Sequence, residues 1–166
     1  MRGMSEKEIR LLIELRIIFN HPLVSKKIKV AQFGLGPIGR SCVQLLAERE
    51  EYEIVGGIDI APELAGKGVA EVCQLKEITA GKVYPSFSEM WGEVQPEVVV
   101  HTAGSRAAVT FTQCRPMLEK GLAVVSSCEE LLFPAFRAPK ESKEYHELCL
   151  RSGGRILGRW RWTVDK

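Results

Sequence analysis

The chain has 166 residues, of which 45% are hydrophobic, as expected for one globular domain with a hydrophobic core and not for a disordered chain. Its 23 basic and 21 acidic residues leave a net charge of +2, an imbalance too small to indicate a nucleic-acid or polyphosphate surface by charge alone. Five widely spaced cysteines without a CxxC pair argue against a disulfide framework and a zinc site. We therefore expect no metal and a reducing, cytoplasmic setting.

Residues 1–25 precede the first predicted strand and are expected to form a separate helical extension. Apolar residues recur there at mostly helical spacing, at Ile9, Leu12, Ile13 and Ile17. Charged residues interrupt the segment, so it is neither a signal peptide nor a membrane span. We interpret it as an amphipathic helix that packs on the domain or on a partner subunit, with a wrongly chosen start codon as the alternative.

The stretch 29–40, KVAQFGLGPIGR, is the motif around which the chain is organised. A short apolar strand leads directly into Gly34, Gly36 and Gly39, and a helix is expected over 41–49. In a dinucleotide-binding βαβ unit the first glycine permits a sharp turn and the second lets the backbone approach a pyrophosphate. The third glycine allows the helix to pack closely on the strand. Glycine turns without a ligand are the alternative.

An acidic residue ends the second predicted strand, 52–58. Asp59 follows Gly39 by 20 positions, where the fingerprint places the acid that binds the ribose hydroxyls. A turn or capping role before Pro62 is the alternative. Turn, helix, strand and acid together favour dinucleotide binding.

The rest of the chain alternates short strands and helices, which predicts an α/β fold, a Rossmann-type doubly wound parallel sheet with helices on both faces over residues 26–158. Expected strands are 83–84, 97–102, 122–125 and 155–157. Expected helices are 69–75, 86–94 with a capping box at Ser86 and Glu89, 106–120 with a kink or stop at Pro116, and 138–151. The run 97–102 has the composition of a strand that is buried on both faces.

Two residues at strand ends suggest catalysis, and we interpret both as structural. His101 ends a buried strand, where histidines are more often hydrogen-bonded than catalytic. Cys128 has acidic neighbours and no histidine or basic residue beside it, which argues against a nucleophile. Glu129 and Glu130 are expected to be favourable charges at a helix start.

Residues 159–166 form an atypical tail in which two tryptophans alternate with arginines. A terminal strand and a small nucleic-acid patch are both compatible with this pattern. Because no wider basic surface accompanies it, we expect no nucleic-acid partner.

Four segments, KIKVAQFGLGPIGR, IVGGIDI, VVVHTAGSR and GLAVVSSCEELLFP, together resemble the 2,4-diaminopentanoate dehydrogenase family over about residues 27–158. More distantly they are similar to the amino-terminal domain of dihydrodipicolinate reductases. The resemblance implies an NAD(P)-dependent oxidoreductase of amino acid metabolism: a hydride moves from an amine-bearing carbon to the nicotinamide, and water hydrolyses the imine.

The same resemblance implies the cofactor-binding residues. The pyrophosphate is assigned to Gly34, Gly36, Pro37, Ile38 and Gly39, the adenosine ribose to Asp59, and the nicotinamide ribose to Thr102, Ala103 and Gly104. An acid at position 59 would repel a 2′-phosphate and therefore favours NAD, whereas Arg40 would soften this preference and leaves NADP open.

Members of the family continue through a segment of the form GTGVNPG into a second α/β domain that supplies substrate contacts and much of the oligomer interface. This chain has GRWRWTVDK instead, so we expect a truncated member that is weak or inactive alone, and we assign no catalytic residue. The implied partners are the dinucleotide, a small amine or amino-acid-like substrate in a full-length relative, and a second copy in a homo-oligomer, with no membrane. Two alternatives are a non-catalytic nucleotide-binding or redox-sensing module, and an interaction protein that uses the extension and the tail.

Overall fold

The computed structural model describes residues 26–76 and 80–158. The expected amino-terminal helix of 1–25 and the tail 159–166 lie outside the described residues. Within the described part, no helix is long and apolar enough to cross a membrane.

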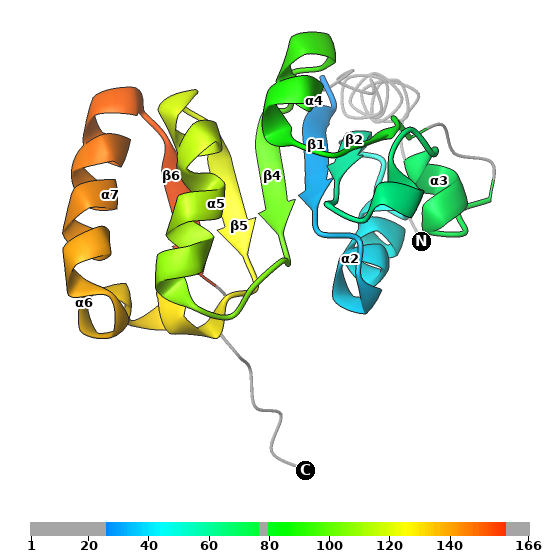
Figure 1. Cartoon of the computed structure of the whole chain (residues 1–166). Coiled ribbons are helices and arrows are strands. Elements are labelled where there is room, and N and C mark those ends of the chain that lie inside the picture. The colour runs from blue at the N-terminus through cyan, green and yellow to red at the C-terminus, as the bar shows by residue number, and fades with distance from the viewer. Residues whose placement is uncertain (1–25, 77–79, 159–166) are drawn as a thin grey trace, which may run out of the picture.

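Six parallel strands form one sheet in the order β3-β2-β1-β4-β5-β6. The strands are β1 Ile28–Phe33, β2 Tyr52–Ile58, β3 Val83–Tyr84, β4 Val98–His101, β5 Ala123–Ser126 and β6 Arg155–Gly158. This order confirms the predicted doubly wound fold, because the chain builds outward from β1 to β3 and then crosses back to continue from β4 to β6. The strand order therefore reverses between β1 and β4 (Figure 1).

Helices and short 3₁₀ turns connect the strands. In chain order they are α2 Pro37–Ala47, the 3₁₀ turn η1 Pro62–Leu64, α3 Val69–Val72, α4 Phe87–Glu93, α5 Ala107–Glu119, the 3₁₀ turn η2 Glu129–Leu132, α6 Pro134–Arg137 and α7 Pro139–Ser152. The helix expected over 41–49 begins earlier, because the fixed φ of proline suits the first turn. Helix α5 continues past Pro116, so that residue does not stop it, and the buried Met117 and Leu118 hold the last turn on the core.

The helices cover both faces of the sheet with two hydrophobic cores. Neighbouring residues of one strand point to opposite faces, and Val83 and Tyr84 accordingly belong to different cores. One core joins the sheet to α4, α5 and α7, which lie side by side along it (Figure 1). The other core contains Val43 of α2 and Val69 of α3. The prediction of helices on both faces is confirmed.

The expectation that β4 is buried on both faces is wrong for one face. Val99 and His101 are fully buried, whereas Val98 and Val100 are half-buried. On the neighbouring strand, Val125 is 41% exposed. The reason is the placement of α2 and α3, whose core draws its strand residues from β2 and β3.

Candidate functional site

The residues predicted to bind a dinucleotide come together at the carboxyl edge of the central strands. β1 pairs with both β2 and β4, so the loops after these three strands are neighbours. Backbone hydrogen bonds join them, from Gly34 N–H to Ile58 O at 2.8 Å and from Thr102 N–H to Phe33 O at 2.8 Å. The ten predicted residues, Gly34, Gly36 to Arg40, Asp59 and Thr102 to Gly104, therefore lie on three adjacent loops.

Each glycine of the turn has a different local requirement. Gly34 has φ +88°, a conformation that favours glycine. A Cβ atom added to Gly39 would lie 1.8 Å from the carbonyl oxygen of Gly34, so this position has no room for a side chain. A Cβ atom on Gly36 would meet no described atom within 4 Å, and the residue is exposed. The backbone at Gly36 is thus open to a ligand.

Helix α2 presents an open amino terminus at this edge. Gly36 is its N-cap residue, no described side chain caps it, and Pro37 and Ile38 are exposed. The first N–H groups of a helix lack intrahelical partners and attract anions. The N–H of Arg40 already bonds Gly36 O, whereas the N–H groups of Ile38 and Gly39 have no partner among the described residues and are the available donors of the first turn.

The amino terminus of α5, at the same edge, is occupied by the protein itself. Glu130 Oε2 accepts a hydrogen bond of 2.8 Å from the N–H of Ala107, the first residue of α5. The expectation that Glu129 and Glu130 are charges at a helix start is confirmed for η2, which they open. The additional cap on α5 depends on tertiary structure and has no local sequence signal. Of these two helix termini, α2 is the one available to a phosphate.

Asp59 braces the glycine turn. Its Oδ2 accepts a hydrogen bond of 2.6 Å from Leu35 N–H, and its Oδ1 accepts one of 2.9 Å from Ala61 N–H. The second contact is the turn role considered as an alternative, and the first was not foreseen. A carboxylate can accept about four hydrogen bonds, so this half-buried group retains acceptor capacity for ribose hydroxyls.

Arg40 holds the other side of the same peptide segment. Its Nε donates a hydrogen bond of 2.8 Å to Leu35 O. Leu35, itself 1% exposed, is therefore fixed at its N–H by Asp59 and at its carbonyl by Arg40. The residue between the first two glycines is held in place by both predicted charged residues.

The loop after β4 contributes Thr102, Ala103 and Gly104. Ala103 is exposed, while the hydroxyl of Thr102 turns inward and lies 3.1 Å from Gly34 O. Gln32 Nε2 donates to the same hydroxyl at 2.9 Å. Sequence reasoning missed Gln32, although a glutamine within an apolar strand is the signal that could have identified it.

His101, the last residue of β4, is buried and hydrogen-bonded as a structural residue. Its Nδ1 lies 3.0 Å from Ser126 Oγ and its Nε2 lies 3.0 Å from Gln113 Oε1. Because an amide oxygen only accepts, Nε2 carries the proton and Nδ1 accepts from the serine hydroxyl. Burial lowers the pKa of His101 below its usual value, so the ring is held neutral.

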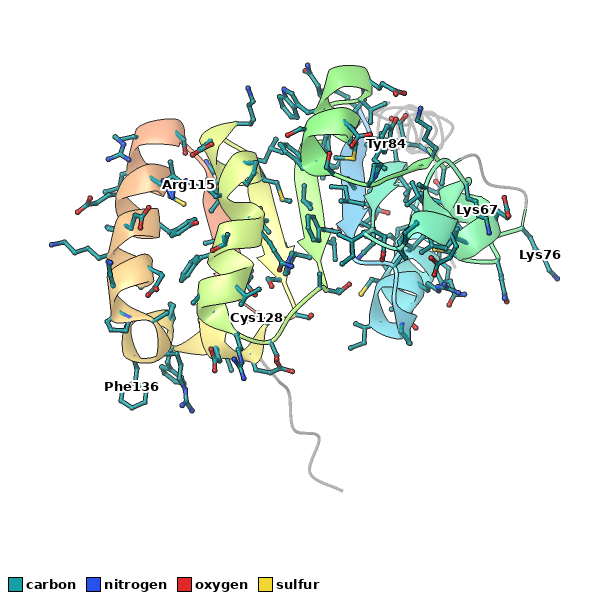
Figure 2. All side chains as sticks on the ribbon, in the orientation of Figure 1. Lys67, Lys76, Tyr84, Arg115, Cys128 and Phe136 are labelled. Carbon is teal, nitrogen blue, oxygen red and sulfur yellow. The ribbon has the colours of Figure 1, made fainter. Side chains whose placement is uncertain are left out.

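Cys128 lies just beyond the end of β5 (Figure 2). Its exposure is 0%, and its N–H donates a hydrogen bond of 3.2 Å to Ser126 Oγ. A thiol without solvent access cannot attack a bound substrate. Among the described residues there is also no cluster of three or more side chains suited to hold a metal ion.

The strand order and the glycine turn define a Rossmann-type α/β domain of the kind found in nucleotide-dependent dehydrogenases. The chain is 25% identical over 133 residues to 2,4-diaminopentanoate dehydrogenase from Acetoanaerobium sticklandii, which confirms the resemblance seen in the sequence. That match covers 80% of this chain and 38% of the relative, so the chain spans less than half of the relative's length. No family model matches the chain.

Solved structures agree on the fold. Amine dehydrogenase from Mycobacterium smegmatis superposes with a TM-score of 0.74 at 24% identity, over 79% of this chain and 38% of that one. WlbA dehydrogenase from Bordetella pertussis, solved in complex with NADH and UDP-GlcNAcA, superposes with a TM-score of 0.59 at 19% identity, over 82% of this chain and 36% of that one. The described part of this chain therefore corresponds to one portion of longer dehydrogenases.

Proposed function

We propose that this chain binds NAD(H) at the glycine turn and forms the dinucleotide-binding part of an oxidoreductase that acts at an amine-bearing carbon. The observation that carries the proposal is the open amino terminus of α2, with Asp59 on the adjacent loop. The similarity to 2,4-diaminopentanoate dehydrogenase supports the class of reaction. The NADH complex of a structural neighbour supports the cofactor.

The residues of the turn fit a dinucleotide. The N–H groups of Ile38 and Gly39 would bind the pyrophosphate, and the bare backbone at Gly36 would allow it to approach. The remaining acceptor positions of Asp59 would bind the adenosine ribose. The loop with the exposed Ala103 and the half-buried Gly104 would lie beside the nicotinamide ribose, since ligands of this fold sit beyond the carboxyl ends of the strands.

Asp59 favours NAD over NADP. Its carboxylate is half-buried beside the glycine turn, and bound to the ribose as proposed it would face the 2′-phosphate of NADP. Two negative charges about 4 Å apart near a protein surface repel by about 4 kcal/mol. The guanidinium of Arg40, held through Nε on the same turn, reduces this repulsion without removing it.

The bound nicotinamide would accept a hydride from the carbon that carries the amine, and water would hydrolyse the resulting imine to a carbonyl and ammonia. The described residues of this chain bind and orient the cofactor, and we assign no acid or base among them. The proposed substrate class is a small amine or amino-acid-like compound. We further propose a cytoplasmic setting, homo-oligomeric assembly, and a division of the chain into 1–25, 26–158 and 159–166.

The test is a calorimetric titration of the protein with NADH and with NADPH at fixed salt, repeated on Asp59→Asn. We expect NADH to bind more tightly, and the ratio of the two affinities to fall at least about tenfold in the variant, because the repulsion is lost. Glu53→Gln, at the opposite end of β2, is the matched control and leaves the ratio unchanged. A folded protein that binds neither dinucleotide would overturn the proposal, and an unaltered ratio in Asp59→Asn would remove the ribose assignment.

A further inference from the structure

We propose that Gln32 and Thr102 are positioning residues that clamp the carbonyl of Gly34 and so hold the glycine turn in its ligand-binding conformation. Neither side chain needs to touch the cofactor for this role. The inference rests on the proposed function, because it concerns how the same turn is prepared for a pyrophosphate.

The clamp consists of three polar contacts among Gln32 of β1, Gly34 in the turn after β1 and Thr102 in the loop after β4. Gln32 Nε2 donates to Gly34 O at 3.0 Å and to Thr102 Oγ1 at 2.9 Å. The Thr102 hydroxyl in turn donates to Gly34 O at 3.1 Å. The carbonyl thus has two side-chain donors, one from β1 and one from the loop after β4, and Gln32 itself is 1% exposed.

The carbonyl that they hold is the contact between the turn and helix α2. Gly34 has φ +88° and, as a glycine, the largest conformational freedom to lose. Its carbonyl oxygen occupies the space that a Cβ atom of Gly39 would need, at 1.8 Å. If this carbonyl rotated away, the first turn of α2 would lose its close contact with the glycine turn. That first turn carries the available N–H groups of Ile38 and Gly39.

The choice of a glutamine is hard to explain by folding alone. The preceding residues Val30 and Ala31 are buried and apolar, as is usual for a central parallel strand. Gln32 Oε1 is buried without a hydrogen-bond partner among the described residues, which disfavours folding. A leucine would avoid that cost, so we attribute the benefit of the amide to the hydrogen bonds that Nε2 donates to Gly34 O and Thr102 Oγ1.

The experiment compares Gln32→Leu, Thr102→Val and Thr102→Ser with the wild-type chain. The matched control is Gln44→Leu, because Gln44 Nε2 also donates to a backbone carbonyl, that of Cys73 at 2.9 Å, away from the turn. Dissociation constants are measured for NADH, for ADP-ribose and for adenosine, which lacks the pyrophosphate. Thermal unfolding is recorded for every variant.

We expect Gln32→Leu and Thr102→Val to bind NADH and ADP-ribose about 3- to 10-fold more weakly, the range that one lost hydrogen bond gives. Adenosine affinity should stay unchanged, Thr102→Ser should restore dinucleotide binding, and Gln32→Leu should melt no lower than Gln44→Leu. Equal weakening for all three ligands, or unchanged NADH affinity in Gln32→Leu, would refute the clamp while the proposed function stands. A folded wild type that binds no dinucleotide would overturn both.

Discussion

Replacing Gly36 with aspartate should separate binding from folding. Gly36 is the N-cap of α2 with φ −66° and ψ −174°, which any residue can adopt, and an added Cβ atom meets no described atom within 4 Å. Aspartate is among the favoured N-cap residues, so the free energy of unfolding should change by no more than about 0.5 kcal/mol or rise. The substitution is compatible with the fold.

Binding should change far more. The new carboxylate would stand where the pyrophosphate approaches, and two unit charges about 4 Å apart at an effective dielectric constant of about 20 repel by about 4 kcal/mol. That energy corresponds to an affinity about 1000-fold lower. Calorimetric titration with NADH measures the loss, and chemical denaturation measures the stability.

Two further variants make the comparison strict. Gly92→Asp adds the same charge at another glycine whose Cβ would meet no described atom within 4 Å, near the end of α4, and should leave NADH affinity unchanged. Gly39→Ala should instead unfold the turn region, because its Cβ atom would lie 1.8 Å from Gly34 O, with a loss of stability of about 3 kcal/mol or more. A folded Gly36→Asp variant whose NADH affinity stays within threefold of wild type would refute the assignment of the pyrophosphate to this turn.

Two predictions concern stability. Burial lowers the pKa of His101 below 6.5, so at lower pH the unfolded chain takes up a proton that the folded chain does not. As the pH is lowered from 6.5, the free energy of unfolding should therefore decrease by up to about 1.4 kcal/mol per pH unit until the folded pKa is reached. Chemical denaturation at a series of pH values should show that this dependence is lost in His101→Gln and kept in His146→Gln, a change at an exposed histidine. Glu130→Ala removes the cap from α5 and should cost about 1 kcal/mol without altering NADH affinity, whereas Glu129→Ala, the neighbouring exposed carboxylate, should change neither; equal losses in the two variants would contradict the capping role.

The elements that sequence could predict are those with strong local signals. Strand β2 has the predicted bounds, since its apolar run stops at a charged residue. The N-cap at Ser86 is confirmed, because its hydroxyl accepts from Glu89 N–H at 3.3 Å, a contact within four residues. The doubly wound order followed from the regular alternation of strands and helices.

The features that sequence could not predict depend on residues far apart in the chain. One face of β4 is half-buried because α2 and α3 pack on β2 and β3, and the residue types at 98–101 do not indicate which strands these helices cover. The cap that Glu130 gives to Ala107 and the clamp between Gln32 and Thr102 are contacts between segments separated by 23 and 70 positions. The detailed contacts of the site therefore depend on tertiary structure, whereas its location could be predicted from the local sequence.

The most direct measurement of the central claim is backbone amide NMR of the protein titrated with NADH. We predict that the largest shift changes fall on Ile38 and Gly39 in the first turn of α2, on the loop after Asp59, and on Ala103 and Gly104 after β4. Saturation should occur at the same NADH concentration for all of them. Shift changes that are absent, or that concentrate on α7 and β6 and leave the glycine turn unaffected, would contradict the account.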